Sequence, residues 1–207
     1  MTAYYFDAEL GYDDERTIAK IKEYLSRGEG RRPPIEPDKA KIITIQYQKI
    51  TWGKPVGDLI ILKEWESSEE EIIRQFIQNI DPKNMWDFIP VGYFVYFDLY
   101  LMKTRAEQLK IESDWRSNDW FVFHDLPVIN IRDICRGTND FRLTGSGLSS
   151  FTQFKTQDGI NVPLWYWEQN YDKIIDYIET ETKAFFDVYS KLKAELPKFR
   201  EERNFFG

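Results

Sequence analysis

Residues 3–11 (AYYFDAELG) constrain the fold more than any other segment, because two carboxylates stand one residue apart at the end of an apolar run. The aromatic residues at positions 4–6 favour a buried β-strand. Residues i and i+2 of a strand point to the same side, so Asp7 and Glu9 project together. Adjacent unpaired carboxylates repel each other, whereas a divalent cation that prefers oxygen ligands favours the charged pair. The stretch therefore predicts either a metal site or a strand that ends in two solvated acids.

Length and composition predict one domain. A chain of 207 residues with 42% hydrophobic residues can form a single core, so we treat residues 1–207 as one domain. The only cysteine, Cys135, excludes an internal disulfide and favours a reducing compartment, for which we expect the cytoplasm. The N-terminus has no basic segment followed by an apolar run, and proline, glycine and aspartate interrupt the most apolar stretch, residues 88–101. We therefore expect neither secretion nor a membrane span.

The net charge of −7 argues against nucleic-acid binding through bulk electrostatic attraction. Any such binding needs a local basic patch or bound cations. The densest basic spot in the N-terminal half is the Gly- and Pro-rich stretch 27–34, which carries Arg27, Arg31 and Arg32. This stretch is either a contact for a phosphate backbone or a solvated loop, since exposed charge clusters usually have no specific partner.

Hydrophobic periodicity predicts a mixed α/β architecture. Apolar residues at helical spacing predict helices over residues 13–26, 67–80, 95–109 and 170–196. Alternating or short apolar runs predict strands over residues 41–50 and 58–65, as a hairpin, and over 88–93. Further extended segments are expected over residues 120–124 and 128–132, and a connector over 136–150 that leads into a short helix at 148–154. The order strand, helix, hairpin, helix is typical of mixed α/β folds.

Two further acidic positions stand out. Asp98 falls in the first turn of the helix expected from residue 95, where the helix dipole favours a carboxylate by about 0.3–1 kcal/mol whether or not it has another role. Tyr177 and Glu181 lie one turn apart on a common face of the last helix, and Glu181 interrupts an apolar stripe. A buried acid there is costly unless it meets a cation. The only histidine, His124, excludes a multi-histidine zinc site and is expected in a loop or the core.

In their order along the chain, these acidic elements resemble the motifs of the DEDD family of 3′–5′ exonucleases, proofreading-type nucleases with an RNase H-like fold. Residues 6–9 (FDAE) resemble the first motif, Phe-Asp-x-Glu. Residues 92–98 (GYFVYFD) resemble the second, Gly-x-Asn-x-x-Phe-Asp, which a leucine-containing helix with an arginine follows, here Arg105. Residues 177–181 (YIETE) stand where the tyrosine subgroup has Tyr-x-x-x-Asp. The resemblance covers most of the chain and implies an α/β fold with an RNase H-like mixed β-sheet flanked by helices.

The chain departs from the family motifs at two positions. Phe94 replaces the asparagine of the second motif, which bears on substrate contacts. Glu181 replaces the final aspartate and is one methylene longer, which bears on metal geometry and rate.

The resemblance implies hydrolysis of phosphodiester bonds at nucleic-acid 3′ ends by a two-metal mechanism. Two Mg²⁺ or Mn²⁺ ions about 3.5–4 Å apart would stabilise the attacking and leaving oxygens. By this resemblance Asp7 would bridge both ions, Glu9 and Glu181 would complete the first, and Asp98 would hold the second largely through water. Tyr177 would orient the attacking water. A phenol with an ordinary pKa of about 10 suits this role and is a poor general base at neutral pH.

The expected partner is single-stranded DNA or RNA with a free 3′ end. Two divalent cations would take the net charge from −7 to about −3 and reverse its sign locally. Residues 165–167 (WYW) are expected either to stack unpaired bases or to pack in the core. The alternative is a catalytically degenerate domain that binds nucleic acid or a partner protein, which Phe94 and Glu181 favour. Residues 203–207 suggest either a role in a larger assembly or a frayed or packed terminus.

Overall fold

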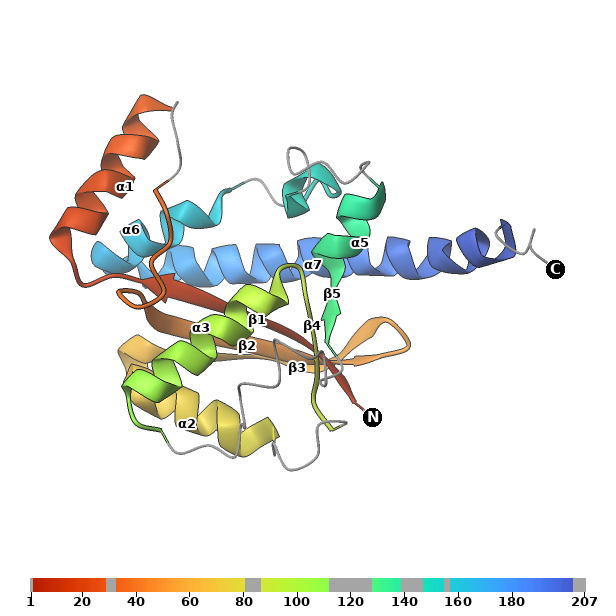
Figure 1. Cartoon of the computed structure of the whole chain (residues 1–207), viewed down its shortest axis with the longest axis horizontal. Coiled ribbons are helices and arrows are strands. Elements are labelled where there is room, and N and C mark those ends of the chain that lie inside the picture. Colours follow the sequence, from red (N-terminus) through yellow and green to blue (C-terminus); the bar gives the residue numbers. More distant parts are fainter. Residues whose placement is uncertain are drawn as a thin grey trace.

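A mixed β-sheet forms the centre of the computed structural model, which describes residues 2–28, 33–80, 87–111, 128–138, 147–154 and 157–202 (Figure 1). Within these ranges the sheet has five strands in the order β3-β2-β1-β4-β5. They are β1 (Ala3–Gly11), β2 (Lys41–Thr51), β3 (Lys54–Lys63), β4 (Ile89–Gly92) and β5 (Ile129–Asn130). β1 pairs antiparallel with β2 and parallel with β4, while β2 and β3 are antiparallel and β4 and β5 parallel. The acidic first strand therefore occupies the middle of the sheet.

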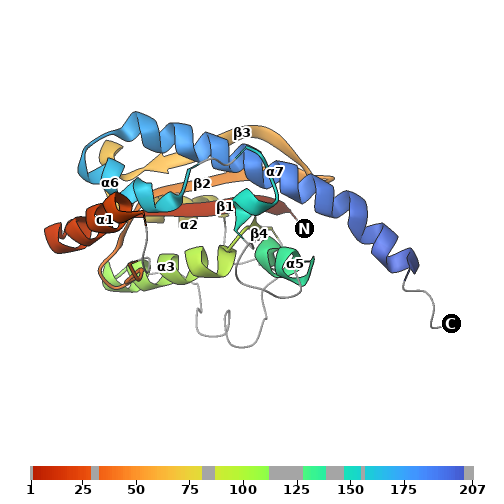
Figure 2. The ribbon, with the colours of Figure 1, turned by 90° about the horizontal axis from the view of Figure 1, so that it is seen from above.

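Helices cover both faces of this sheet, which confirms the predicted α/β class. The α-helices are α1 (Glu15–Arg27), α2 (Glu69–Ile80), α3 (Val95–Gln108), α5 (Ile131–Thr138), α6 (Val162–Trp167) and α7 (Tyr171–Glu202). The short 3₁₀ turns are η1 (Glu64–Glu66), η2 (Leu148–Ser150) and η3 (Gly159–Asn161). Figure 2 shows α7 along one side of the sheet and α3 along the other. Among the described helices, none is long and apolar enough to cross a membrane.

The alternation of side chains along β1 decides which residues meet which helices. Phe6 is fully buried in the cluster with α2 and α3, where its ring stacks on Phe76 at 5.1 Å between centroids. Tyr5 points the other way and packs on Phe185 of α7 at 4.6 Å. Because every second residue shares a face, Asp7 and Glu9 lie on the α7 side with Tyr5.

A close approach of backbone segments holds α3 beside β1. A Cβ atom at Gly92, the last residue of β4, would lie 2.7 Å from the carbonyl oxygen of Phe6 and 2.9 Å from the Cβ of Val95. Only glycine fits there without a shift of the backbone. The tight turn brings the first turn of α3, and with it Asp98, against the central strand.

A buried ion pair ties α2, α3 and β2 together. Arg105 donates from Nε and from a terminal nitrogen to the two carboxylate oxygens of Glu69, at 2.7 and 2.6 Å. The Glu69 carboxylate also accepts from the backbone N–H of Ile42 at 2.7 Å. Arg105 follows the second motif in the sequence. Its side chain is bound to Glu69, so it positions α3 and is not directed at the carboxylates of β1.

The strands and long helices follow the predictions to within four residues at each end, except that α7 runs six residues further, to Glu202. The segment after residue 127 differs more. Residues 128–132 are predicted to be extended, whereas β5 spans only Ile129–Asn130 and α5 begins at Ile131. The buried side chains of Ile131 and Cys135 stand four apart, the spacing of a helix. In place of the helix expected at 148–154, the structure has the single turn η2.

Other predictions lie wholly or partly outside the described residues. These are the extended segment 120–124 with His124, the arginines at 31 and 32, much of the connector 136–150, and the tail 203–207.

Candidate metal centre

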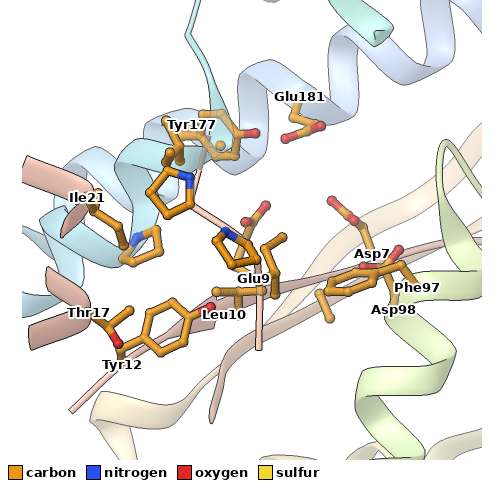
Figure 3. Close-up of a pocket in the computed structure, with 17 residues that line it drawn as sticks. Asp7, Glu9, Leu10, Tyr12, Thr17, Ile21, Phe97, Asp98, Tyr177 and Glu181 are labelled. Carbon is orange, nitrogen blue, oxygen red and sulfur yellow. The ribbon is translucent and has the colours of Figure 1, made fainter. Parts of the chain in front are cut away.

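Carboxylates from β1 and α7 converge at one point. Asp7, Glu9 and Glu181 each offer an oxygen, and within the described residues these oxygens all lie within 4.8 Å of one another. Figure 3 shows Asp7 and Glu9 rising from the strand toward Glu181, which comes from the helix opposite. All three side chains are partly buried. Like charges this close repel, so the cluster favours a hard divalent cation, for which carboxylate oxygens are the usual ligands.

A row of buried polar side chains on β2 holds Asp7 in place. Gln46 stands opposite Asp7 in the strand register and donates from Nε2 to Asp7 Oδ2 at 3.0 Å. Thr44 donates its hydroxyl to Gln46 Oε1 at 3.0 Å, which fixes the orientation of the amide. Both side chains are fully buried. Their hydrogen bonds therefore hold the Asp7 carboxylate in one orientation.

Tyr5 adds a second donor to the same oxygen. Its hydroxyl donates to Asp7 Oδ2 at 3.3 Å. Burial, followed by the charges of Asp7 and Glu181, raises the pKa of the Tyr5 phenol well above its ordinary value. The phenol therefore stays protonated and remains a donor to the carboxylate.

Asp98 joins the site from α3. It is 6% exposed and lines the same cavity as the three clustered acids (Figure 3). Burial raises its pKa well above the ordinary value, and the charges of Asp7 and Glu181 raise it further. Asp98 does not belong to the group whose oxygens lie within 4.8 Å of one another. Its position is that of a fourth, more distant carboxylate.

Tyr177 lies one helical turn before Glu181 and completes the site. The side chain is 6% exposed, and Figure 3 shows its hydroxyl directed toward Glu181. Burial raises its pKa well above the ordinary value, and the charges of Glu181 and Glu9 and the hydrogen bond to Glu181 raise it further. A Cβ atom at Gly159 would lie 2.9 Å from this hydroxyl oxygen. The turn η3 therefore closes against a neutral phenol that acts as a hydrogen-bond donor.

Two cavities meet at the carboxylates. The smaller, of about 160 Å³, is lined by the five residues singled out from the sequence and by residues of α1 and the segment after it. The larger, of about 760 Å³, lies beside it and shares Tyr177 and Glu181 with it. The smaller cavity has room for cations and water. The larger one is of the size that small-molecule ligands occupy.

The structure places the other highlighted residues away from the cluster or in structural roles. Tyr166 of α6 donates to Glu64 at 2.6 Å, and the Lys41 ammonium lies 4.7 Å from the centre of the Tyr166 ring. Trp165 packs against Tyr177 with ring centroids 6.0 Å apart. Two of the three aromatic residues at 165–167, Trp165 and Tyr166, are therefore partly buried and pack against the hydrophobic core. Arg27 ends α1 and pairs with Glu23.

Gln46, Thr44 and Gly159 are site residues that the sequence alone does not reveal. The alternation of β2 predicts that Thr44 and Gln46 share a face, but only the register with β1 shows that this face carries Asp7. The chain matches no protein-family model, and no curated protein matches it.

Proposed function

We propose that the chain is a metal-dependent 3′–5′ exonuclease that hydrolyses phosphodiester bonds at nucleic-acid 3′ ends. The observation that carries the proposal is the convergence of Asp7, Glu9 and Glu181, with oxygens within 4.8 Å of one another, in a cavity that Asp98 and Tyr177 also line. These are the five positions that the resemblance to the DEDD exonucleases assigns to a two-metal site. They come from three separate segments of the chain, β1, α3 and α7.

The architecture supports the same proposal. A mixed sheet with helices on both faces is compatible with the RNase H-like fold that the resemblance implies. The first motif lies on the central strand, and the second lies at the turn from β4 into α3. The third motif lies on α7, which crosses the face of the sheet that carries Asp7 and Glu9.

The donor set fits divalent cations. Asp7, Glu9 and Glu181 would hold the first ion, and Asp7 and Asp98 the second. When bound, the ions would stabilise the charge that builds up on the phosphate and on the attacking and leaving oxygens. Gln46 and Tyr5 hold one oxygen of Asp7 by hydrogen bonds, so the carboxylate is oriented before any ligand arrives.

Tyr177 would position the attacking water. Its raised pKa keeps the phenol protonated at neutral pH, so it donates a hydrogen bond and does not remove a proton. Gly159 leaves room for this hydroxyl, because a Cβ atom at that position would lie 2.9 Å from its oxygen. A water oriented in this way reacts faster, because the entropic cost of aligning it with the phosphorus is no longer part of the activation barrier.

The longer side chain at the third motif is compatible with metal binding. The Glu181 carboxylate reaches within 4.8 Å of the oxygens of Asp7 and Glu9. The extra methylene thus does not remove the third acid from the cluster. This weakens one of the two reasons to regard the site as degenerate.

The test is cleavage of a labelled single-stranded oligonucleotide in Mg²⁺, in Mn²⁺ and in EDTA, by the parent and by Asp7→Ala. We expect shortening in either metal, none in EDTA, and none by Asp7→Ala. A matched control is Asp58→Ala, which removes an exposed carboxylate from β3 outside both cavities and is expected to cleave like the parent. Cleavage by Asp7→Ala at the parent rate would overturn the proposal.

The second candidate is a degenerate domain that binds nucleic acid without cleaving it. One observation favours it: Phe94, at the asparagine position of the second motif, is 46% exposed and cannot form the amide hydrogen bonds of an asparagine. Binding of the oligonucleotide with no shortening in either metal would support this second candidate over the exonuclease.

A further inference from the structure

The larger cavity leads away from the carboxylate cluster and offers space for a ligand that reaches it. Its volume is about 760 Å³, against about 160 Å³ for the cavity that holds the acids. Ligand sites in proteins typically measure about 300–1,000 Å³. Tyr177 and Glu181 line both cavities, so a ligand in the larger one lies next to the candidate metal centre.

An aromatic pair and an arginine line the larger cavity. The rings of Phe94 and Phe97 are stacked almost parallel, with centroids 5.9 Å apart and an angle of 6° between the planes. The guanidinium carbon of Arg132 lies 4.2 Å from the centre of the Phe94 ring. The backbone N–H of Arg132 donates to the carbonyl of Tyr93 at 3.0 Å, which fixes the start of α5 against the turn before α3. Phe94 and Arg132 are therefore held together by this backbone hydrogen bond as well as by the contact between their side chains.

The larger cavity carries the acids Asp158 and Glu181 and a cation, Arg132, at which an anionic group would bind. Among the described residues that line either cavity, Arg132 is the only cationic side chain. Within the described part of the chain, no carboxylate forms an ion pair with it at 4.0 Å or less. Asp158, an acid in the same wall, accepts a hydrogen bond from the N–H of Ile160 at 3.1 Å and caps η3. A planar guanidinium with several donors suits a phosphate group.

We infer that Phe94 and Arg132 bind the terminal nucleotide of a single strand. The base would stack on the Phe94 ring, and a phosphate would bind the Arg132 guanidinium. The inference rests on the proposed function, because it places the strand end beside Glu181. Phe94 stands where the family motif has an asparagine, so an aromatic surface replaces an amide that could form hydrogen bonds. Stacking uses the π face that every base has, and it requires the base to be unpaired. The substrate class is thus an unpaired 3′ end that carries an intact base, with little dependence on sequence.

Stacking is tested with two single-stranded oligonucleotides that differ only at the 3′ end, one with a normal nucleotide and one with an abasic residue. We expect Phe94→Leu to raise KM for the normal end by about 5- to 150-fold, the range that base–aromatic stacking supplies. KM for the abasic end should not change, so the variant no longer distinguishes the two. Phe94→Tyr keeps a ring and should behave like the parent. Tyr100→Leu removes a similarly exposed aromatic residue of α3 outside both cavities and should leave both KM values unchanged.

The phosphate contact is tested through the salt dependence of KM. Each phosphate contact to a single strand contributes a slope of about 0.7 in the plot of log affinity against log salt concentration. Arg132→Gln should reduce that slope by about this amount. Arg74→Gln removes a positive charge from α2, which lines neither cavity, and should leave the slope unchanged.

The outcomes separate the inference from the proposed function. A parent that shortens neither oligonucleotide refutes the proposed function. A parent that shortens both equally well, together with Phe94→Leu and Arg132→Gln variants that keep its KM values and salt slope, overturns the inference and leaves the exonuclease in place. Thermal unfolding of each variant confirms that it is folded, and Arg132→Gln provides an independent result if Phe94→Leu is not.

Discussion

Glu181 is the residue on which the chemistry of the site depends most, because it brings the only clustered carboxylate of the described residues that does not come from β1. If it is a metal ligand, Glu181→Gln should lose cleavage and weaken Mn²⁺ binding, since the amide keeps the shape but not the charge. Glu181→Asp should retain or raise activity, because it restores the residue of the family motif. Glu179→Gln, on the exposed side of the same helix turn, is the matched control. A Glu181→Gln variant as active as the parent would remove this residue from the site.

Asp98 should make the metal-free protein less stable as the pH rises. Burial and the charges of Asp7 and Glu181 raise its pKa in the folded protein above the unfolded value of about 3.9. The folded protein therefore binds this proton more tightly than the unfolded chain. That stability is fully present below the unfolded pKa and is lost as the pH rises through the folded pKa.

Asp98→Asn should consequently raise the Tm of the metal-free protein at neutral pH, because it removes the cost of a buried charge. At a pH below about 3.9 the carboxyl is protonated in both states, and the advantage should vanish. Thermal unfolding in EDTA across this pH range measures both effects. An unchanged or lower Tm at neutral pH would mean that the carboxylate is stabilised by contacts other than a metal.

Tyr177→Phe should separate water positioning from metal binding. The variant loses the hydroxyl beside Glu181 but keeps the ring that packs on Trp165. We expect kcat to fall by about 10²-fold, the scale of a small misplacement of a reacting group. The Mn²⁺ concentration needed for half-maximal rate should stay the same. A change in metal requirement with kcat preserved would instead make Tyr177 part of the ligand shell.

At the scale of elements, the ion pair between α2 and α3 holds the second motif in position. The side chains of Arg105 and Glu69 are 15% and 9% exposed. Arg105→Met leaves the Glu69 carboxylate buried without its cation, which should lower the free energy of unfolding by about 3–5 kcal/mol. Denaturant unfolding measures this loss.

The matched control is the pair of Arg74 and Glu70 on the exposed side of α2, whose side chains are 41% and 50% exposed. Arg74→Met should cost less than about 1 kcal/mol, as exposed ion pairs do. Equal losses in the two variants would show that the buried pair does not hold α3 in the way described.

Much of the element order follows from the sequence, because long periodic segments leave little ambiguity. The strand of residues 3–11 follows from its run of aromatic residues, the first strand of the hairpin from its alternation, and the long last helix from its helical period. Short elements lack that advantage. Residues 128–132 combine an apolar run with a helical spacing, and α6 has only six residues, so tertiary packing decides both.

The site was predictable only in part, because its assembly depends on tertiary packing, as the short elements do. Asp7 and Glu9 share a face by the geometry of a strand, and Tyr177 and Glu181 by that of a helix. That these two faces meet depends on where α7 crosses the sheet, which no local pattern contains. The roles of Gln46 and Gly159 depend on strand register and on a close approach to Tyr177, both of which exist only in the folded chain.

For the whole molecule, the fold should be more stable with metal than without it. Millimolar Mg²⁺ or Mn²⁺ should raise the Tm of the parent, because a ligand that binds only the folded state stabilises it. Asp7→Ala should show little of this increase. Its own metal-free Tm should change little, because the relief of carboxylate repulsion is offset by the buried donors of Gln46 and Tyr5, which lose their acceptor. An equal increase in both proteins would place the bound metal elsewhere.

The most direct measurement is the direction of cleavage on a single strand that carries its label at either end. With Mn²⁺, a 5′ label should appear in a ladder of successively shorter strands, and a 3′ label should be released at once as a mononucleotide. Neither product should form in EDTA or with Asp7→Ala. Internal cuts, release from the 5′ end, or the same products from Asp7→Ala would contradict a 3′–5′ exonuclease built on the carboxylates of β1 and α7.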